Sequence, residues 1–183
     1  ADYSMEKQQT VVNSAVYSGI ALHSGARSAV RVQPAPENTG IVFRRVDLPG
    51  RPEVRALASN VVDVRRGTTI ASGNAVVFTV EHIMSALNAF HIDNCIVEMD
   101  GMEPPIGDGS SLPYCRMLRE AGVQVQEAEA KVFTPASPLY VEGGHTRLVI
   151  VPGPELRIAC TTSFPGCPID PQFYEFTATT PDA

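Results

Sequence analysis

Glu81 and His82 are neighbours in the segment FTVEHIMSALNAFHIDN, residues 78–94, and side chains of these two types can together carry out metal-assisted hydrolysis. An imidazole ring is a frequent zinc ligand, and a carboxylate beside it can take a proton from water that the metal activates. Each residue also has a simpler interpretation. A carboxylate stabilises a helix N-terminus, and a lone histidine is ordinary on a helix surface. The pair alone is therefore a weak indication of a site.

A helix over residues 80–90 is predicted to position this pair. Apolar residues recur there at helical spacing and form one stripe: Val80, Ile83, Met84, Leu87 and Phe90. Thr79 is the expected N-cap. Glu81 and His82 lie outside the stripe, about 100° apart around the axis, so both can point toward a cleft at the helix start. His91 would face the opposite side of a straight helix from His82, and it is interpreted as a helix-end residue that shares no metal with it.

Short strands and a second helix are expected around this helix. Segments rich in Val and Ile, interrupted by Gly, Pro and Asn, indicate strands before residue 79: TVVNSAVYSGIAL, SAVRVQ, GIVFRRV and VRALASNVVDV. After the helix we expect a strand at 95–99, a Gly/Pro-rich loop at 100–109 and a helix from Ser110 to about residue 121. Its buried side would carry Leu112, Cys115, Leu118 and Ala121, with Gly122 as its stop. The polar stretch 126–138 is predicted to be a linker, after which strands resume.

A weak internal repeat supports two domains, 1–128 and 129–183. The segments GARSAVRVQPAPE (25–37) and GGHTRLVIVPGPE (143–155) share a glycine, an alternating apolar pattern and a Pro-x-Pro-Glu end at a constant offset. Two strands that each end in a Pro-x-Pro turn can also match by chance, so the repeat is a hypothesis.

Composition narrows the class of protein. The chain has 183 residues, 44% of them apolar and 19% charged, with a net charge of −6, which argues against a protein that tracks nucleic-acid phosphates. Arginines nevertheless gather in the first third of the chain: Arg44, Arg45, Arg51, Arg55, Arg65 and Arg66. A solvated surface of strands and loops is the favoured interpretation of this cluster. The alternative is a patch that binds an anionic group, such as the diphosphate of a nucleotide sugar.

Cysteine usage and the absence of long apolar runs favour the cytoplasm. The four cysteines show no CxxC pair, and Cys95 and Cys115 fall within apolar patterns typical of buried small side chains. A thiol-dependent enzyme is therefore poorly supported. The first residues, ADYSMEKQQT, lack the apolar core of a signal peptide, and no run is long enough to span a bilayer.

Four segments together resemble the N-terminal part of the UDP-3-O-acyl-N-acetylglucosamine deacetylase family. They are SGIALHSG (18–25), PAPENTGIVFRRVDL (34–48), TVEHIMSALNAFHIDN (79–94) and EPPIGDGSSLPY (103–114), and the resemblance runs from about residue 7 to 165. It implies a zinc hydrolase of lipid A synthesis that releases acetate from the 2-acetamido group of a UDP-linked, 3-O-acylated glucosamine. The implied fold is α+β, a two-layer sheet/helix domain repeated as two similar domains, the second incomplete here.

The resemblance also implies roles for single residues. The family's TVEH motif is intact, so His82 would be a zinc ligand and Glu81 the general base. His23, in LHSG, matches a histidine near the family's active site, where it would have an auxiliary polar role or form a turn. Thr68 and Thr69 belong to a loop that would line the substrate pocket.

The resemblance also bears on Asp108 and on the zinc ligands other than His82. Asp108, in IGDGS, would cap the second helix, hold a loop, or act at the active-site groove, near which the family places this turn. A catalytic zinc needs three protein ligands. The family supplies a histidine and an aspartate from an HxxxD-type motif, and a general-acid histidine, in its second domain. After residue 140 only His145 is present, without such a motif.

The chain is therefore interpreted as a fragment that is inactive by itself, from a monomer that does not span a membrane. A non-catalytic binding or assembly module derived from the same fold is the alternative. The downstream reading frame would distinguish the two.

Overall fold

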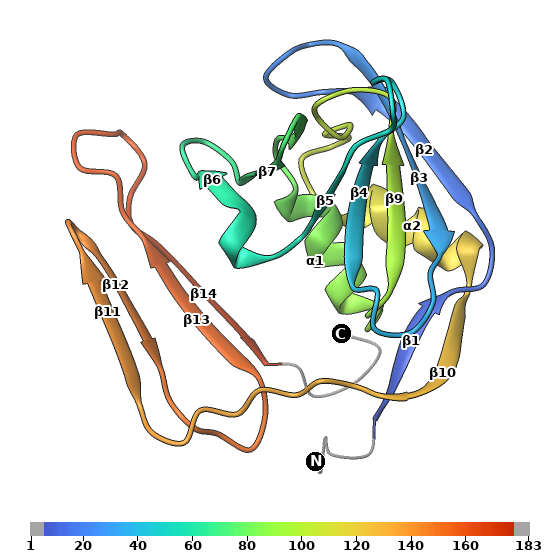
Figure 1. The fold of residues 1–183 in the computed structure, drawn as a ribbon. Coiled ribbons are helices and arrows are strands. Elements are labelled where there is room, and N and C mark those ends of the chain that lie inside the picture. Colours follow the sequence, from blue (N-terminus) through green and yellow to red (C-terminus); the bar gives the residue numbers. More distant parts are fainter. Residues whose placement is uncertain (1–5, 178–183) are drawn as a thin grey trace. The chain divides into compact units, whose positions relative to one another are not determined.

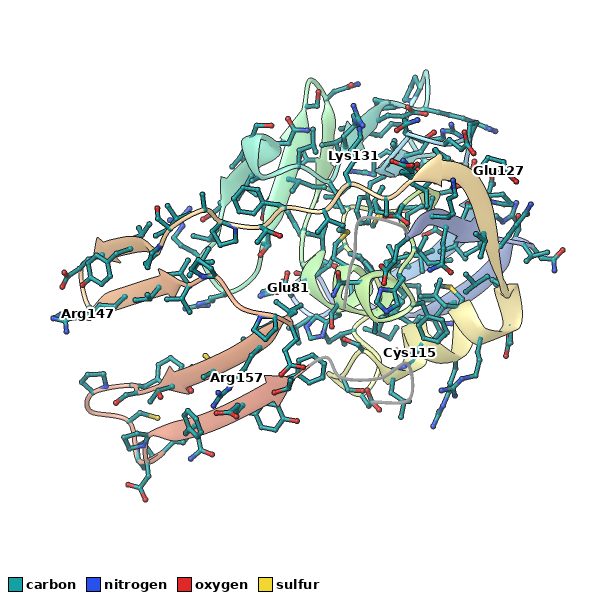
Figure 2. The ribbon with its side chains drawn as sticks, turned by 90° about the horizontal axis from the view of Figure 1, so that it is seen from below. Glu81, Cys115, Glu127, Lys131, Arg147 and Arg157 are labelled. Carbon is teal, nitrogen blue, oxygen red and sulfur yellow. The ribbon has the colours of Figure 1, made fainter. Side chains whose placement is uncertain are left out.

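The computed structural model of the protein describes residues 6–177, and contacts divide them into two compact units, residues 6–130 and residues 131–177. Figure 1 draws both units as ribbons, and Figure 2 labels Glu127 and Lys131 on either side of the division. The boundaries of two domains, 1–128 and 129–183, stay a prediction, because contacts alone do not show that either part is an independent domain.

A five-stranded sheet forms one layer of the first unit. It is built from β2 (Ala15–Ile20), β3 (Arg27–Pro34), β9 (Cys95–Met99), β4 (Ile41–Arg45) and β5 (Glu53–Arg55), in that spatial order. Neighbouring strands are antiparallel except β4 and β9, which run parallel. A parallel pair requires a long crossover connection, and residues 46–94 supply it. The strand predicted at residues 95–99 is confirmed.

Two helices, α1 (Glu81–Ala89) and α2 (Leu112–Ala121), form the second layer. They pack on each other and on one face of the five-stranded sheet (Figure 1). The core between the layers contains alternate residues of the central strands, such as Val32, Phe43 and Val97, and the buried sides of both helices. A helix as short as α1 is marginal in water, so this packing is what stabilises it. The first unit is therefore α+β, with a sheet layer and a helix layer.

Helix α1 buries the apolar stripe predicted for it, but it does not have the predicted N-cap residue. Ile83 and Leu87 are buried, and Met84 and Phe90 pack partly against the core. Thr79, however, makes no cap hydrogen bond, and the residue at the N-cap position is Val80.

The buried side of α2 differs from its prediction. Its buried residues are Tyr114, Met117, Leu118 and Ala121, whereas Leu112 is 44% exposed and Cys115 is only partly buried. Both sets recur at helical spacing, so periodicity could not separate them. The contacts of Tyr114 determine which side of α2 is buried. Its hydroxyl donates to the Pro105 carbonyl, and its ring meets Tyr17 edge to face. The helix also begins at Leu112 rather than at Ser110.

A small three-stranded sheet lies within the crossover between β4 and β9. It contains β6 (Val61–Asp63), β7 (Thr69–Ser72) and β8 (Ala75–Val77) in antiparallel order, preceded by the short 3-10 helix η2 (Ala58–Asn60). The connection from β6 to β7 reaches the start of α1, where the Val80 N–H donates to the Thr68 carbonyl oxygen at 3.3 Å. This sheet therefore holds the loop 64–68 against the helix that carries the TVEH motif.

The predicted linker at 126–138 was wrong in its first part. Residues Val123–Glu129 form strand β10, which pairs antiparallel with β1 (Lys7–Val11) and belongs to the first unit. The polar character that suggested a linker arises because most of β10 is exposed. Within the predicted linker, regular structure is absent from residues 130–138.

The second unit consists of two antiparallel hairpins within the described residues. One pairs β11 (Leu139–Gly143) with β12 (Thr146–Ile150), and the other pairs β13 (Arg157–Thr162) with β14 (Gln172–Thr177). The two segments of the sequence repeat lie in β3 and β12, each the second strand of an antiparallel pair. A repeat of the whole domain topology stays a prediction.

The arginines of the first third do not form one surface. Arg45 is 4% exposed, so its assignment to a solvated face was wrong. Its guanidinium donates to both Asp47 carboxylate oxygens, at 2.8 and 2.6 Å, and to the Val76 carbonyl. Arg44 and Arg65 also form ion pairs with carboxylates of the same unit. Since these three charges are already paired, a common anion-binding patch gains no support.

The surroundings of Cys95 and Cys115 do not favour a reactive thiol. Cys95 is fully buried, and its burial raises the pKa of the thiol to about 11, so the reactive thiolate is scarce at neutral pH. Burial also raises the pKa of Cys115, which Figure 2 labels on α2.

Among residues 6–177, no helix has both the length and the apolar character needed to cross a membrane.

Candidate functional site

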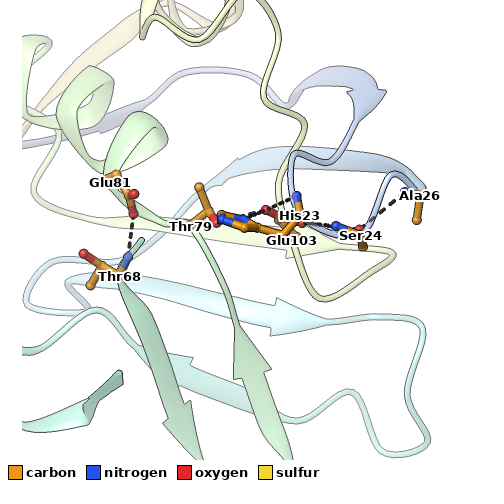
Figure 3. Close-up of polar contacts among 7 residues, drawn as sticks. All are labelled: His23, Ser24, Ala26, Thr68, Thr79, Glu81 and Glu103. Atoms are coloured by element: carbon orange, nitrogen blue, oxygen red, sulfur yellow. Dashed lines mark hydrogen bonds and ion pairs between the residues drawn. The ribbon is translucent and has the colours of Figure 1, made fainter. Parts of the chain in front are cut away.

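The Glu81 side chain is anchored at the start of α1. Its Oε2 accepts a hydrogen bond of 2.9 Å from the backbone N–H of Thr68, in the loop before β7 (Figure 3). Its position in the first helical turn also places the carboxylate at the positive end of the helix dipole. A second segment of the chain therefore fixes the carboxylate. A glutamate at a solvated helix end would have no such hydrogen-bond partner.

Thr79 carries an unusual backbone conformation immediately before this helix. Its φ is +53°, a region that a β-branched residue adopts at a cost of about 1–3 kcal/mol. The side chain is buried, and its Oγ1 donates to Glu103 Oε1 at 2.9 Å. The prediction of Thr79 as N-cap was wrong for this reason: the hydroxyl is engaged by a carboxylate and the backbone turns in the left-handed region.

Glu103 is the centre of a buried polar network. It is 2% exposed, and it accepts hydrogen bonds from the backbone N–H groups of His23 and Ser24, each at 3.1 Å, and from the Ser24 hydroxyl. Burial alone would raise the pKa of this carboxyl group, but the hydrogen bonds from His23, Ser24 and Thr79 outweigh it and hold the pKa below its usual value. Glu103 is therefore ionised at neutral pH although it is buried.

His23 joins the same network through its ring. The Nδ1 atom lies 2.8 Å from Glu103 Oε1 and 3.3 Å from Thr79 Oγ1 (Figure 3). Because an ionised carboxylate only accepts, we assign the proton of the neutral ring to Nδ1, which leaves the Nε2 lone pair free. The side chain is 38% exposed. The structure thus places His23 beside Thr79, the first residue of the TVEH motif.

Replacement of Glu103 by glutamine is expected to destabilise the protein by about 2–4 kcal/mol, because buried donors lose a charged acceptor. The folded-state pKa is below the unfolded-state pKa, so this stabilisation is present above the unfolded-state pKa and is lost as pH falls through the folded-state pKa. Urea denaturation at several pH values measures both effects, with Glu120→Gln, on the exposed side of α2, as control. Equal stability of the two variants at neutral pH would contradict this account.

His82 follows Glu81 on α1 and is half-buried. Within residues 6–177 its ring makes no hydrogen bond, so either ring nitrogen can be the unprotonated one that binds a ligand. His91 lies beyond the end of α1 and is exposed, which confirms its interpretation as a helix-end residue. The two histidines are therefore not on one continuous helix.

The remaining candidates occupy two different places. Thr69 is the first residue of β7, next to Thr68. Asp108 is exposed and accepts hydrogen bonds from the N–H and hydroxyl of Ser110, which lower its pKa. It therefore holds the turn before α2, and no hydrogen bond among the described residues joins it to Glu81 or His82.

The donor set near His82 fits only part of a zinc site. Within residues 6–177, no group of three His, Cys, Asp or Glu side chains is placed to hold a metal ion. Zinc in a catalytic site takes three protein ligands. His82 can supply one imidazole, and Glu81 Oε2 accepts the Thr68 N–H.

Two open hollows on the first unit lie away from these residues. The larger is on the outer face of the five-stranded sheet, where Arg31, Gln33 and Glu98 contribute to its walls, and neither hollow includes a candidate residue. The cleft expected at the start of α1 stays a prediction.

Two residues of this region were not singled out from the sequence. Glu103 lies in the quoted segment EPPIGDGSSLPY, where no local pattern distinguishes a buried carboxylate from a solvated one. Gly67 precedes the Thr68–Thr69 pair, and its role depends on contacts that only the folded chain brings together.

A carboxylate fixed beside a half-buried imidazole at a helix start, in an α+β fold, suits hydrolysis by general-base catalysis. Comparison with known families agrees with this class. The model of the family described as UDP-3-O-acyl N-acetylglycosamine deacetylase matches residues 8–182. The chain belongs to this family, and the resemblance of its four segments is confirmed.

Curated relatives with the name UDP-3-O-acyl-N-acetylglucosamine deacetylase are similar over most of the chain. The protein from Chlamydia abortus is 39% identical over 94% of the chain and 61% of its own length. Those from Citrifermentans bemidjiense and Myxococcus xanthus are 41% and 40% identical, over 91% and 88% of the chain and 54% and 51% of their own lengths. The chain thus spans between half and about three-fifths of the length of these relatives.

Proposed function

We propose that the protein is a zinc-dependent deacetylase of the cytoplasm that hydrolyses the 2-acetamido group of UDP-3-O-acyl-N-acetylglucosamine in lipid A biosynthesis. The relatives carry the name of this activity. The observation that supports it most strongly in this chain is the anchored Glu81 carboxylate beside His82 at the start of α1. Since the chain spans only part of its relatives, the activity is proposed for the full-length protein.

Glu81 would act as general base. Oε2 is held by the Thr68 N–H, which leaves Oε1 to take a proton from the attacking water. The water oxygen bonds to the amide carbonyl carbon, and the C–N bond then breaks as the leaving nitrogen takes up a proton, either the one that Glu81 received or one from the general-acid histidine expected in the second domain. Acetate and the free amine are the products. A bound zinc ion would lower the pKa of the water and polarise the carbonyl group, as this reaction needs.

The other candidate residues would bind the metal or the substrate. His82 would be one zinc ligand, and the further ligands are expected outside residues 6–177. His23, held by Glu103, and the Thr68–Thr69 loop lie at the same end of α1 and would have substrate-binding or auxiliary roles. Asp108 would contribute through the turn that it holds. The 183-residue chain alone is expected to be inactive, and the protein to act as a monomer.

The full-length protein is expected to release acetate from UDP-3-O-acyl-N-acetylglucosamine, to lose this activity after treatment with a zinc chelator and to regain it when zinc is restored. Acetate measured in an enzyme-coupled assay gives the rate, and UDP-N-acetylglucosamine without the acyl chain is the control substrate, expected to react much more slowly. Binding of the acylated substrate without acetate release would instead favour a non-catalytic binding or assembly module.

A further inference from the structure

The loop before β7 is joined to the start of α1 by two hydrogen bonds through one residue. The Thr68 N–H donates to Glu81 Oε2 at 2.9 Å, and the Thr68 carbonyl accepts from the Val80 N–H at 3.3 Å. Both backbone groups of Thr68 are therefore committed to the turn that contains Glu81. In a capping box a glutamate at the third helical position bonds to the N–H of its own N-cap residue, whereas Glu81, the first helical residue, bonds to another segment of the chain.

Gly67 allows this approach because it has no side chain. A Cβ atom built on Gly67 would lie 3.3 Å from Thr79 Oγ1 and 3.4 Å from Glu81 Oε1, and the φ of +156° is one that side chains rarely adopt. The contact at 3.3 Å is tighter than most real Cβ contacts, and Thr79 cannot easily move since its hydroxyl is bonded to Glu103. A Cβ atom here would also be in van der Waals contact with Oε1, so the glycine leaves that side of Oε1 free of side-chain atoms from residue 67.

We propose that Gly67 and Thr68 are positioning residues for the general base. The Thr68 N–H fixes Oε2, and the missing side chain at Gly67 leaves Oε1 unobstructed to accept the proton. In this positioning role the backbone of Gly67 and Thr68 acts through Glu81. This inference rests on the proposed function, in which Glu81 is the base.

Amide exchange tests the hydrogen bond without any activity measurement. In metal-free full-length protein followed by NMR, the Thr68 amide is expected to exchange at least about 10-fold faster in Glu81→Ala than in the wild type, because its acceptor is gone. Glu81→Gln, which keeps an acceptor oxygen, should retain most of the protection. Unchanged Thr68 exchange in Glu81→Ala would overturn the proposal, whatever the enzyme does.

Kinetics test whether the loop acts through Glu81. Gly67→Ala is expected to lower kcat for acetate release by about 10- to 100-fold with KM little changed, since a base displaced by a fraction of an ångström loses its alignment. Gly73→Ala is the matched control, because Gly73 also has a positive φ, +56°, but has open space around it. In a Glu81→Ala background, Gly67→Ala should cost nothing further.

Additive losses in the double variant, or equal losses from the two glycine replacements, would overturn the positioning role. If Gly67→Ala does not fold, the exchange experiment still decides. If the wild-type protein releases no acetate, the proposed function fails while the Thr68–Glu81 hydrogen bond remains tested by exchange.

Discussion

Glu81→Ala in the full-length protein is expected to lower kcat for acetate release by about 10²–10⁴-fold, the usual contribution of a positioned acid or base. Bound zinc should be retained, because Glu81 is proposed as the general base and not as a metal ligand. Steady-state kinetics give the rate, and metal analysis of the same preparation gives the zinc content.

Glu120→Ala is the control for this replacement. Glu120 is an exposed carboxylate on α2, so its removal should change neither the rate nor the metal content. Near-normal turnover in Glu81→Ala would mean that Glu81 only stabilises the helix start. An equal loss of turnover in both variants would point to charge or stability rather than to a base.

His82→Ala is expected to weaken zinc binding by the full-length protein by more than about 100-fold, which exceeds the 10- to 100-fold loss typical of residues that only orient a ligand. His91→Ala should have little effect, since His91 lies exposed beyond the end of α1. Titration against a zinc-sensitive competitor measures both affinities. Similar losses in the two variants would contradict the assignment of His82.

The 183-residue chain provides a second test of the same ligand. One imidazole cannot supply the geometry of a three-ligand site, so the isolated chain is expected to hold zinc weakly and to release no acetate. Any residual binding should disappear in His82→Ala. Tightly held zinc at one ion per chain after dialysis would mean that ligands within this chain had been overlooked.

The elements that position the site were predictable where one strong pattern governed them. The stripe of α1 and the alternation in β9 both face a single core, so their periodicity carried the information. In α2 two sets of residues had helical spacing, and only the contacts of Tyr114 selected one. Strand β10 looked like a linker because an exposed strand carries polar residues.

The candidate site was predictable in part, through its motifs. Glu81 and His82 were identified by type, spacing and the TVEH segment, but their surroundings depend on distant parts of the chain. Thr68 reaches Glu81 from the loop before β7, and Glu103 meets Thr79 from the loop after β9. Hydrogen bonds of this kind depend on tertiary structure and leave no periodic signal in sequence. The strained φ of Thr79 is equally invisible, because a β-branched residue is not expected there.

The most direct test of the central claim measures acetate release and bound zinc together, on the same preparations of full-length wild-type protein and Glu81→Ala. The account predicts about one zinc per chain in both, with rapid acetate release from UDP-3-O-acyl-N-acetylglucosamine only in the wild type. Comparable acetate release by both proteins at equal zinc content would contradict it.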